Sequence, residues 1–189
     1  MDLLCAWFAK WLLNVNTQKS AVMVFRSRKM PPVHLRITAN SASVHQVRCH
    51  RHLGIHLNGT LTWSDHVVSV ISKASARIGF LRRLSPQLDS ITLRELYTKC
   101  IRPSLEYGSI VWSGLQTMDA DLLEKYDRRA AHLILKVRTS TPRDLPPDLL
   151  LARAGISRLE PRRKLEQVTF CIRVFCKKLP AHLQESISR

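Results

Sequence analysis

The first sixty positions contain one helical pattern, followed by patterns typical of strands. Apolar residues recur at steps of three and four over residues 3–14, which predicts a helix with an apolar face. Short apolar runs predict strands at 21–25 and 33–38. Pro31 and Pro32 separate these runs, and proline continues neither element because it lacks a backbone donor.

A third strand is predicted over residues 46–57 from strict alternation of apolar and polar residues. The alternating residues are Leu53, Ile55 and Leu57 on the apolar side and His52, Gly54 and His56 on the polar side. The pair Asn58-Gly59 favours a turn. The mixed N-terminal part is therefore expected to end between residues 58 and 63.

Beyond Trp63 the apolar spacing is helical. Steps of three and four predict helices over residues 64–83, 93–112, 122–137 and 160–179. Pro103 is expected to kink or restart the second helix, and the proline-containing stretch 139–147 to link the third to the fourth. The predicted fold is α+β and mainly α, with a mixed part at residues 1–60 and a helical part at residues 61–189.

The charge narrows the choice of partner. Thirty Lys and Arg against fourteen Asp and Glu give a net charge of +16, which calls for a polyanion or an anionic surface. On the third helix a basic stripe lies opposite the apolar one; its members are Lys125, Arg128, Arg129, His132 and Lys136. Like charges at these spacings destabilise an isolated helix, so the stripe favours a phosphate-rich partner.

The sequence gives little support for a membrane span, a signal peptide or a metal site. The longest apolar run, residues 3–9, is too short to span a membrane, and no signal peptide or membrane contact is expected. The five cysteines are odd in number and lack a C-x-x-C pair, which argues for a reducing intracellular location, nuclear or cytoplasmic.

His50, His52 and His56 share strand parity, but Gly54 interrupts them and no metal site is predicted. The four tryptophans are predicted to be core residues.

Five stretches in fixed order carry a family resemblance. The first is Trp7-x-x-x-Trp11-x-Leu13-x-x-Asn16-x-x-Lys19-Ser20-x-x-Met23-x-Phe25. The second is His52-Leu53-Gly54-Ile55-x-Leu57 followed by Leu61-x-Trp63-x-x-His66. The others are Arg77-x-Gly79-Phe80-Leu81-Arg82-Arg83, Leu96-Tyr97-x-x-x-Ile101-Arg102-Pro103-x-Leu105-Glu106-Tyr107-Gly108-x-x-x-Trp112 and Leu123-Glu124-Lys125-x-x-Arg128-Arg129-Ala130-Ala131. Together they resemble the C-terminal part of the reverse transcriptase, an RNA-directed DNA polymerase, of non-LTR (LINE-type) retrotransposons.

The resemblance implies an architecture and a set of roles. Residues 1–60 would be the end of a polymerase palm with short antiparallel strands, and residues 61–189 a helical thumb/connection region. Leu53 and Gly54 fall at the primer grip, and Lys19 where the family has a palm lysine proposed to protonate departing pyrophosphate. Without the metal carboxylates Lys19 is interpreted as an ordinary turn lysine, with the catalytic role kept for a chain completed by a catalytic palm. RNA or DNA is expected to be held through its phosphate backbone. The candidate contacts are Lys73, Arg77, Arg82, Arg83, Lys125, Arg128, Arg129, Lys136, Arg162 and Arg163.

Catalysis by this chain alone is not expected. The resemblance places the catalytic Asp pair of the family before Met1, and two-metal nucleotidyl transfer needs carboxylates that bridge both ions. Asp119 and Asp121 form the only close aspartate pair and are interpreted as cap and dipole partners of a helix. No cofactor is therefore predicted, with Mg²⁺ expected only if a catalytic palm completes the chain.

Three alternatives remain open beside the reading as a nucleic-acid-binding fragment. Helix faces that would contact the missing palm could instead dock another protein. The chain could be a degenerate relic of an element with no selected role. It could also be the C-terminal piece of an active enzyme, with the missing N-terminal polymerase part as its partner.

Overall fold

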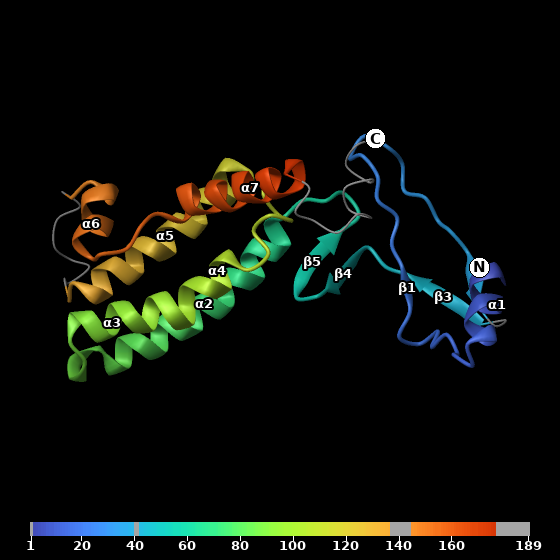
Figure 1. Ribbon diagram of the computed structural model, residues 1–189, viewed down its shortest axis with the longest axis horizontal. Coiled ribbons are helices and arrows are strands. Elements are labelled where there is room, and N and C mark those ends of the chain that lie inside the picture. The colour runs from blue at the N-terminus through green and yellow to red at the C-terminus, as the bar shows by residue number, and fades with distance from the viewer. Residues whose placement is uncertain (1, 40–41, 137–144, 177–189) are drawn as a thin grey trace. The chain divides into compact units, whose positions relative to one another are not determined.

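The computed structural model describes residues 2–39, 42–136 and 145–176, and its fold is α+β and mainly α, as predicted (Figure 1). The chain separates into two compact units, Met1–His66 and Val67–Arg189. All the strands lie in the first unit and most of the helical residues in the second, within the described residues. The assignment of these parts to a partial palm and a thumb/connection region stays a prediction.

The first unit contains one helix and five short strands. They are α1 (Asp2–Lys10), β1 (Ala21–Val22), β2 (Ile37–Ala39), β3 (Ala42–Gln46), β4 (Cys49–His52) and β5 (Ile55–Asn58). In one sheet β3 is central, with β1 parallel and β2 antiparallel to it. In the other, β4 and β5 form an antiparallel hairpin. The sequence analysis did not predict β3 as a separate strand.

Helix α1 ends four residues earlier than predicted. The backbone N–H of Leu13 bonds to the carbonyl of Phe8 at 2.9 Å, and that of Leu12 bonds to the carbonyl of Ala9 at 3.0 Å. With Leu12 at a φ of 57°, these two bonds are those of a Schellman motif, which closes a helix. The prediction that Trp7 and Trp11 are core residues was wrong, because their exposed fractions are 55% and 61%.

The predicted single strand over residues 46–57 was also wrong. Leu53 and Gly54 have φ values of 46° and 87°, and these positive values at both central positions are those of a type I′ hairpin turn. Across the hairpin His52 opposes Ile55, and Arg51 opposes His56. The turn therefore puts His50 and His52 on one face and His56 on the other, so the three imidazoles predicted to share a face do not.

The strands predicted at 21–25 and 33–38 are shorter than expected because side chains replace part of the backbone ladder. The Gln46 side chain accepts a hydrogen bond from the Leu35 N–H at 2.8 Å and donates one to the Val33 carbonyl at 2.7 Å. These bonds hold residues 33–35 beside β3 without a regular strand. The segment that follows β1 is held by a backbone contact instead. The Arg26 N–H donates to the Gly59 carbonyl at 2.8 Å.

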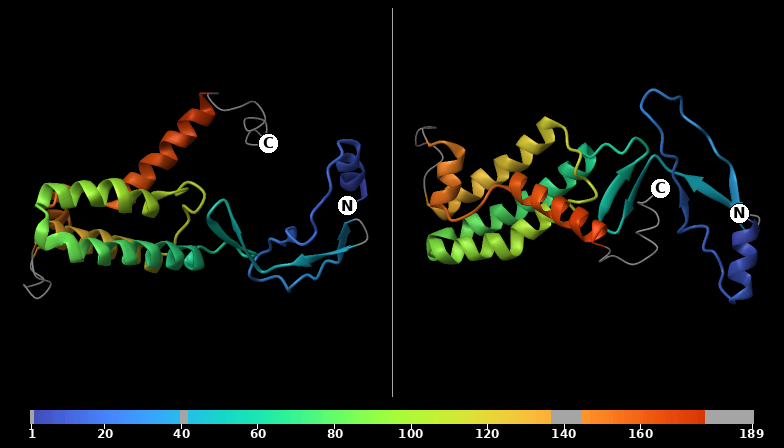
Figure 2. Two further views of the ribbon diagram at one scale, coloured as in Figure 1. Left: turned by 90° about the horizontal axis from the view of Figure 1, so that it is seen from below. Right: turned by 45° about the horizontal axis from the view of Figure 1, so that its top comes forward.

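The second unit is helical within its described residues. Its elements are α2 (Ser64–Leu84, continuous with the first unit), the 3₁₀ turn η1 (Ser85–Gln87), α3 (Ser90–Leu96), the π segment η2 (Tyr97–Ile101), α4 (Arg102–Glu106), α5 (Thr117–Ile134), α6 (Pro147–Arg153) and α7 (Leu159–Phe175). Figures 1 and 2 show α3 and α4 lying in line alongside α2. Fully buried side chains join the helices, among them Val67 of α2, Leu93 of α3, Leu105 of α4 and Leu123 of α5.

The break predicted at Pro103 is present as a π segment. The Arg102 N–H bonds to the Tyr97 carbonyl, five residues back, and this wider turn precedes Pro103, which cannot donate. The helix does not continue to residue 112 as predicted, because Tyr107 adopts a ψ of 120° and Gly108 a φ of 66°. Trp112 nevertheless lies fully buried, as predicted, and its indole N–H bonds to the Tyr107 carbonyl at 2.9 Å.

The last two predicted helices are confirmed with different boundaries. Helix α5 begins five residues earlier than predicted, with Gln116 as its cap and Asp119 in its first turn. Helix α7 begins after Arg158 and carries Pro161 in its first turn, and the predicted end at residue 179 lies outside the described residues. Most of the predicted linker, residues 139–144, also lies outside them, while Pro147 opens the unpredicted helix α6.

Candidate nucleic-acid interface

The candidate cations of α2 lie on its exposed side. Lys73, Arg77, Arg82 and Arg83 are all exposed, while Val67, Val70, Ile71, Ala74 and Leu81 of the same helix are buried. Arg77 donates to the Cys100 carbonyl at 3.0 Å, so part of its guanidinium is used within the unit. Arg83 lies over the ring of exposed Phe80, 5.7 Å from its centroid. The last turn of α2 thus presents two arginines to solvent at the helix end that favours cations.

The candidate cations of α5 also follow an exposed face. Lys125 and Arg129 are exposed and Arg128 is half-buried. Arg129 lies over the Tyr126 ring, 4.9 Å from its centroid, which holds its planar group against the helix. Lys136 follows the end of the helix at a φ of 54° and is exposed. Of the basic stripe predicted from the sequence, these four residues reach the surface, whereas His132 is half-buried and its Nδ1 is buried.

Six of these cations have no acidic partner among the described residues, a property that they share with other basic residues such as Arg26 and Arg48. Within the described residues, no carboxylate lies within 4 Å of Lys73, Arg82 or Arg83 of α2, or of Lys125, Arg128 or Arg129 of α5. We name these six residues the cationic set. The C-terminal ends of α2 and α5 lie at the same end of the helical unit as α6 (Figure 1, Figure 2).

Arg162 and Arg163 of α7 are used inside the unit instead. Both Nε and Nη2 of Arg162 donate to the Glu106 carboxylate in a bidentate pair. Arg163 is only 7% exposed and lies 4.3 Å from the centroid of the Trp112 ring. Its Nη2 donates to the Trp112 carbonyl at 3.4 Å. These guanidinium groups therefore help to hold α7 to the preceding segment. Arg163 is buried and Arg162 stays exposed, and contact of either with a phosphate stays a prediction.

Asp127 forms a buried polar centre that the sequence analysis did not predict. The Tyr97 hydroxyl donates to Asp127 Oδ1, and Arg102 Nη2 lies 3.9 Å from the same oxygen. Arg102 also donates to the Ser157 carbonyl and lies 5.5 Å from the Tyr97 ring centroid. Burial raises the pKa of Asp127 to about 6, while the hydrogen bond from Tyr97 and the Arg102 charge lower it. Burial also raises the pKa of Tyr97.

The second buried acid, Glu124, is also used structurally. Its Oε1 accepts the Glu160 N–H at 2.8 Å in the first turn of α7, and its Oε2 lies 3.6 Å from Arg158 Nε. Glu124 and Asp127, the two neighbouring buried carboxylates, therefore do not fit a Mg²⁺ pair, because both are bound to groups of the chain. Within the described part of the chain, no three His, Cys, Asp or Glu side chains gather as metal ligands.

The primer-grip-like residues lie at the tip of the β4–β5 hairpin. Leu53 is 77% exposed, and Gly54 follows it in the turn. Lys19 is exposed, and its backbone N–H bonds to the Asn16 carbonyl and side chain at 3.2 and 3.1 Å, as in a capped turn. The predicted contacts of Leu53, Gly54 and Lys19 with nucleic acid stay predictions.

Two further observations concern thiols and membranes. All five cysteines lie within the described residues and carry free thiols. No described helix is both long enough and apolar enough to cross a membrane.

Comparison with known proteins identifies two relatives. The chain is 28% identical over 134 residues to the probable RNA-directed DNA polymerase from transposon BS of Drosophila melanogaster, a match that covers 69% of the chain. It is 23% identical over 133 residues to the probable RNA-directed DNA polymerase from transposon X-element of the same organism, which covers 68% of the chain. These matches span about 15% and 14% of the relatives' own lengths. No family model and no solved structure matches the chain. The chain therefore contains a region related to the reverse transcriptases of non-LTR transposons.

Proposed function

We propose that this chain is a nucleic-acid-binding piece of a non-LTR retrotransposon reverse transcriptase. The observation that carries the proposal is the cationic set, six basic side chains on α2 and α5 without carboxylate partners among the described residues. Several acidic residues of the same unit, among them Glu95, Glu106 and Glu160, are paired with other arginines and lysines. In a chain with a net charge of +16, unpaired cations repel one another and lower the stability of the folded state. A bound polyanion would remove this repulsion.

The contacts are of the kind that position nucleic acid without reading its sequence. Lysine and arginine on exposed helix faces reach phosphate oxygens, which every nucleotide carries. The planar groups of Arg83 and Arg129 rest on aromatic rings, so they lose less freedom when they bind than a fully mobile arginine. We therefore expect binding to RNA or DNA with little sequence preference.

The affinity of the protein for a template-primer duplex should fall steeply with salt. Each neutralised phosphate releases a counterion, which gives about 0.7 to 0.9 of a unit of slope in log K against log salt. If four to six members of the cationic set make contact, a slope of roughly −3 to −5 is expected. Fluorescence anisotropy over a range of salt concentrations measures this slope. Affinity independent of salt would contradict the proposal.

Nucleotide incorporation by the purified chain is not expected. Glu124 and Asp127 are held by Tyr97, Arg102 and the backbone of α7, so they do not provide the open carboxylates that bridge two metal ions. A primed RNA template with Mg²⁺ or Mn²⁺ should therefore show no extension. Template-dependent extension that the variant Lys19→Ala reduces would contradict this part of the proposal and would assign Lys19 its catalytic role.

A protein-interaction module is the second candidate function. Leu165, Val168, Ile172 and Phe175 of α7 form a stripe of exposed apolar side chains, with exposed fractions from 54% to 83%. Exposed apolar patches of this kind are typical of protein–protein interaction sites. A stable complex with a protein that does not weaken as salt rises, and that Val168→Glu abolishes, would favour this candidate.

A further inference from the structure

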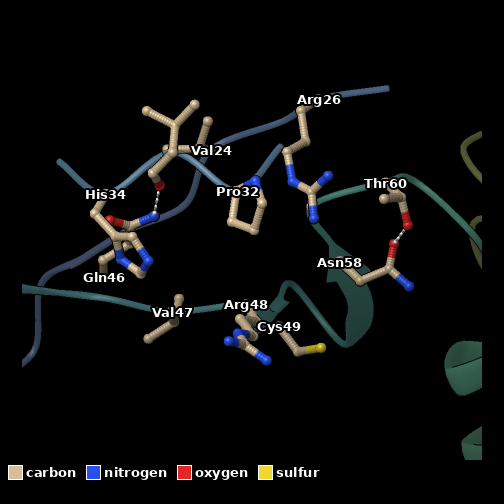
Figure 3. A pocket seen from close by; sticks show the side chains of 12 residues that line it. Val24, Arg26, Pro32, His34, Gln46, Val47, Arg48, Cys49, Asn58 and Thr60 are labelled. Carbon is tan, nitrogen blue, oxygen red and sulfur yellow. Dashed lines mark hydrogen bonds between the residues drawn. The ribbon is translucent and has the colours of Figure 1, made fainter. Parts of the chain in front are cut away.

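The first unit contains an open, positively charged cavity that the proposed helical interface does not use. It has a volume of about 380 Å³ and lies among the segments before β2, at the end of β3 and at the end of β5 (Figure 3). Its lining includes three basic side chains, Arg26, His34 and Arg48. The volume is near the lower end of the range of roughly 300 to 1,000 Å³ typical of small-molecule sites.

Backbone contacts fix the walls of this cavity. The Arg26 N–H donates to the Gly59 carbonyl, and the Gly59 N–H donates to the Arg48 carbonyl at 3.1 Å. A Cβ at Gly59 would lie 2.8 Å from the Val24 carbonyl oxygen, so only glycine permits this approach of the two segments. Three segments distant in sequence are thus tied together around the space.

The amide side chains of the lining are used by the chain itself. Gln46 bonds to the backbone of Val33 and Leu35, and Asn58 accepts the Thr62 N–H at 2.8 Å. The Thr60 hydroxyl lies 3.3 Å from the Asn58 side chain (Figure 3). The groups that remain to meet a ligand are therefore the cationic and apolar ones and the Cys49 thiol.

The basic groups of the lining have no acidic neighbours. Arg26 uses one Nη to bind the Met30 carbonyl, which leaves its other donors, and the described chain places no carboxylate within 4 Å of Arg26 or Arg48. In Figure 3, Arg26 and His34 extend from their segment toward the strand that carries Val47. Residues 1–66 contain eight Lys and Arg but only two acids, Asp2 and Asp65. Asp65 does not line the cavity, and its Oδ2 accepts from the lining residue Asn58 at 3.4 Å.

We propose that this cavity binds a single nucleotide through its phosphate group. Arg26, Arg48 and the imidazole N–H of His34 would donate to the phosphate oxygens, a charge-assisted contact that suits arginine. Val24, Pro32 and Val47 supply an apolar wall for the sugar or base. The phosphate has two possible sources, a free nucleotide and the 5′ end of a strand. The inference does not rest on the cationic set, which belongs to the helical unit.

The experiment is a calorimetric titration of the whole chain with four probes. Adenosine monophosphate is compared with adenosine, and a 5′-phosphorylated trinucleotide with its 5′-hydroxyl form. The phosphorylated member of at least one pair should bind, and its unphosphorylated counterpart should not. Binding of the monophosphate alone identifies a free nucleotide as the ligand, and binding of the trinucleotide alone identifies a strand end. Absence of binding for both phosphorylated probes up to about 10 mM would overturn the proposal.

Two variants assign the binding to this cavity. The double variant His34→Gln, Arg48→Gln changes exposed side chains, so the fold should be retained, and circular dichroism checks this. It should lower the affinity for the phosphorylated probe by about tenfold or more, since the loss of one hydrogen bond to a charged group lowers affinity by about that factor. The matched control Arg36→Gln, Arg51→Gln removes two exposed arginines of the same unit outside the cavity and should leave the affinity unchanged.

Equal weakening by the double variant and its control would overturn the proposal, because the binding would then follow overall charge. A change of Lys125, Arg128 and Arg129 to glutamate separates this site from the helical interface. It should weaken binding of long nucleic acid and leave the monophosphate affinity unchanged. The two proposals can therefore fail independently.

Discussion

Asp127 lies on a helix whose exposed side is basic, yet its own side chain is fully buried. The sequence contained a signal for the burial of Asp127, because Asp127 is four residues from both Leu123 and Ala131, which are apolar. What the sequence could not supply was the partner. Tyr97 and Arg102 lie at least 25 positions away and meet Asp127 only through packing of α3, η2 and α4 on α5.

At the residue scale, Asp127→Asn should change how stability depends on pH. The pKa of Asp127 is raised from its ordinary value to about 6 in the folded state, so the folded state takes up a proton more readily than the unfolded state. Its contribution is therefore fully present below about pH 4 and is lost as pH rises through about 6. Relative to Asp127→Asn, the wild type should lose stability over this window.

Urea denaturation at closely spaced pH values between 4 and 7 measures this difference. Asp148→Asn is the matched control, because Asp148 is exposed in the first turn of α6. The control should keep the wild-type profile. If Asp127→Asn also keeps that profile, Asp127 titrates at the same pH in the folded and unfolded chains, and the buried centre has been misjudged.

Helices were predicted from this sequence far better than strands. The apolar periods of α2, α5 and α7 extend over several turns, so their existence does not depend on any single contact. The strands have two to five residues, and their limits are set by turns and side-chain bonds. The pair Leu53-Gly54 is an example, because a leucine at the first position of a type I′ turn gives no turn signal, and the alternation continues through it.

At the element scale, Leu53→Asn should stabilise the β4–β5 hairpin. Leucine at a φ of 46° has a cost of about 1 kcal/mol that asparagine largely avoids, because its short polar side chain tolerates the left-handed region. Little burial is lost, since Leu53 is 77% exposed. Amide hydrogen exchange of β4 and β5 measures the effect, with Leu35→Asn as the control, because Leu35 is exposed, lies outside the turn and has no positive φ. Faster exchange in Leu53→Asn would mean that the leucine makes contacts that outweigh its backbone strain.

The two units differ in how much apolar surface they bury. Among the described residues of the first unit, Ala39, Val44 and Ile55 are the buried apolar side chains, whereas the second unit buries a leucine or aromatic residue from nearly every helix. Composition and spacing predicted a mixed part followed by a helical part. They did not reveal that the apolar helix α1 would leave Trp7 and Trp11 exposed, because exposure depends on what packs against a helix and not on its pattern.

At the scale of the whole molecule, limited trypsin digestion should cut the first unit before the second. Arg28, Lys29 and Arg36 are exposed and lie between β1 and β2 in irregular backbone, where few contacts oppose local opening. A resistant fragment that begins near the start of α2 is expected by mass spectrometry. If residues 26–51 survive as long as α2 and α5, the first unit is as stable as the helices, and its small core has been underestimated.

The central claim, that the cationic set holds nucleic acid through phosphates, is tested most directly by the salt slope of a charge-reversed variant. Lys125, Arg128 and Arg129 are changed to glutamate on α5, and the matched control changes the exposed residues Arg36, Arg51 and Arg173 in the same way. Both variants alter the net charge equally. The α5 variant should flatten the slope of log affinity against log salt by about two to three units, and the control by much less. Equal slopes for the two variants would contradict the claim, because binding would then depend on total charge and not on this helix face.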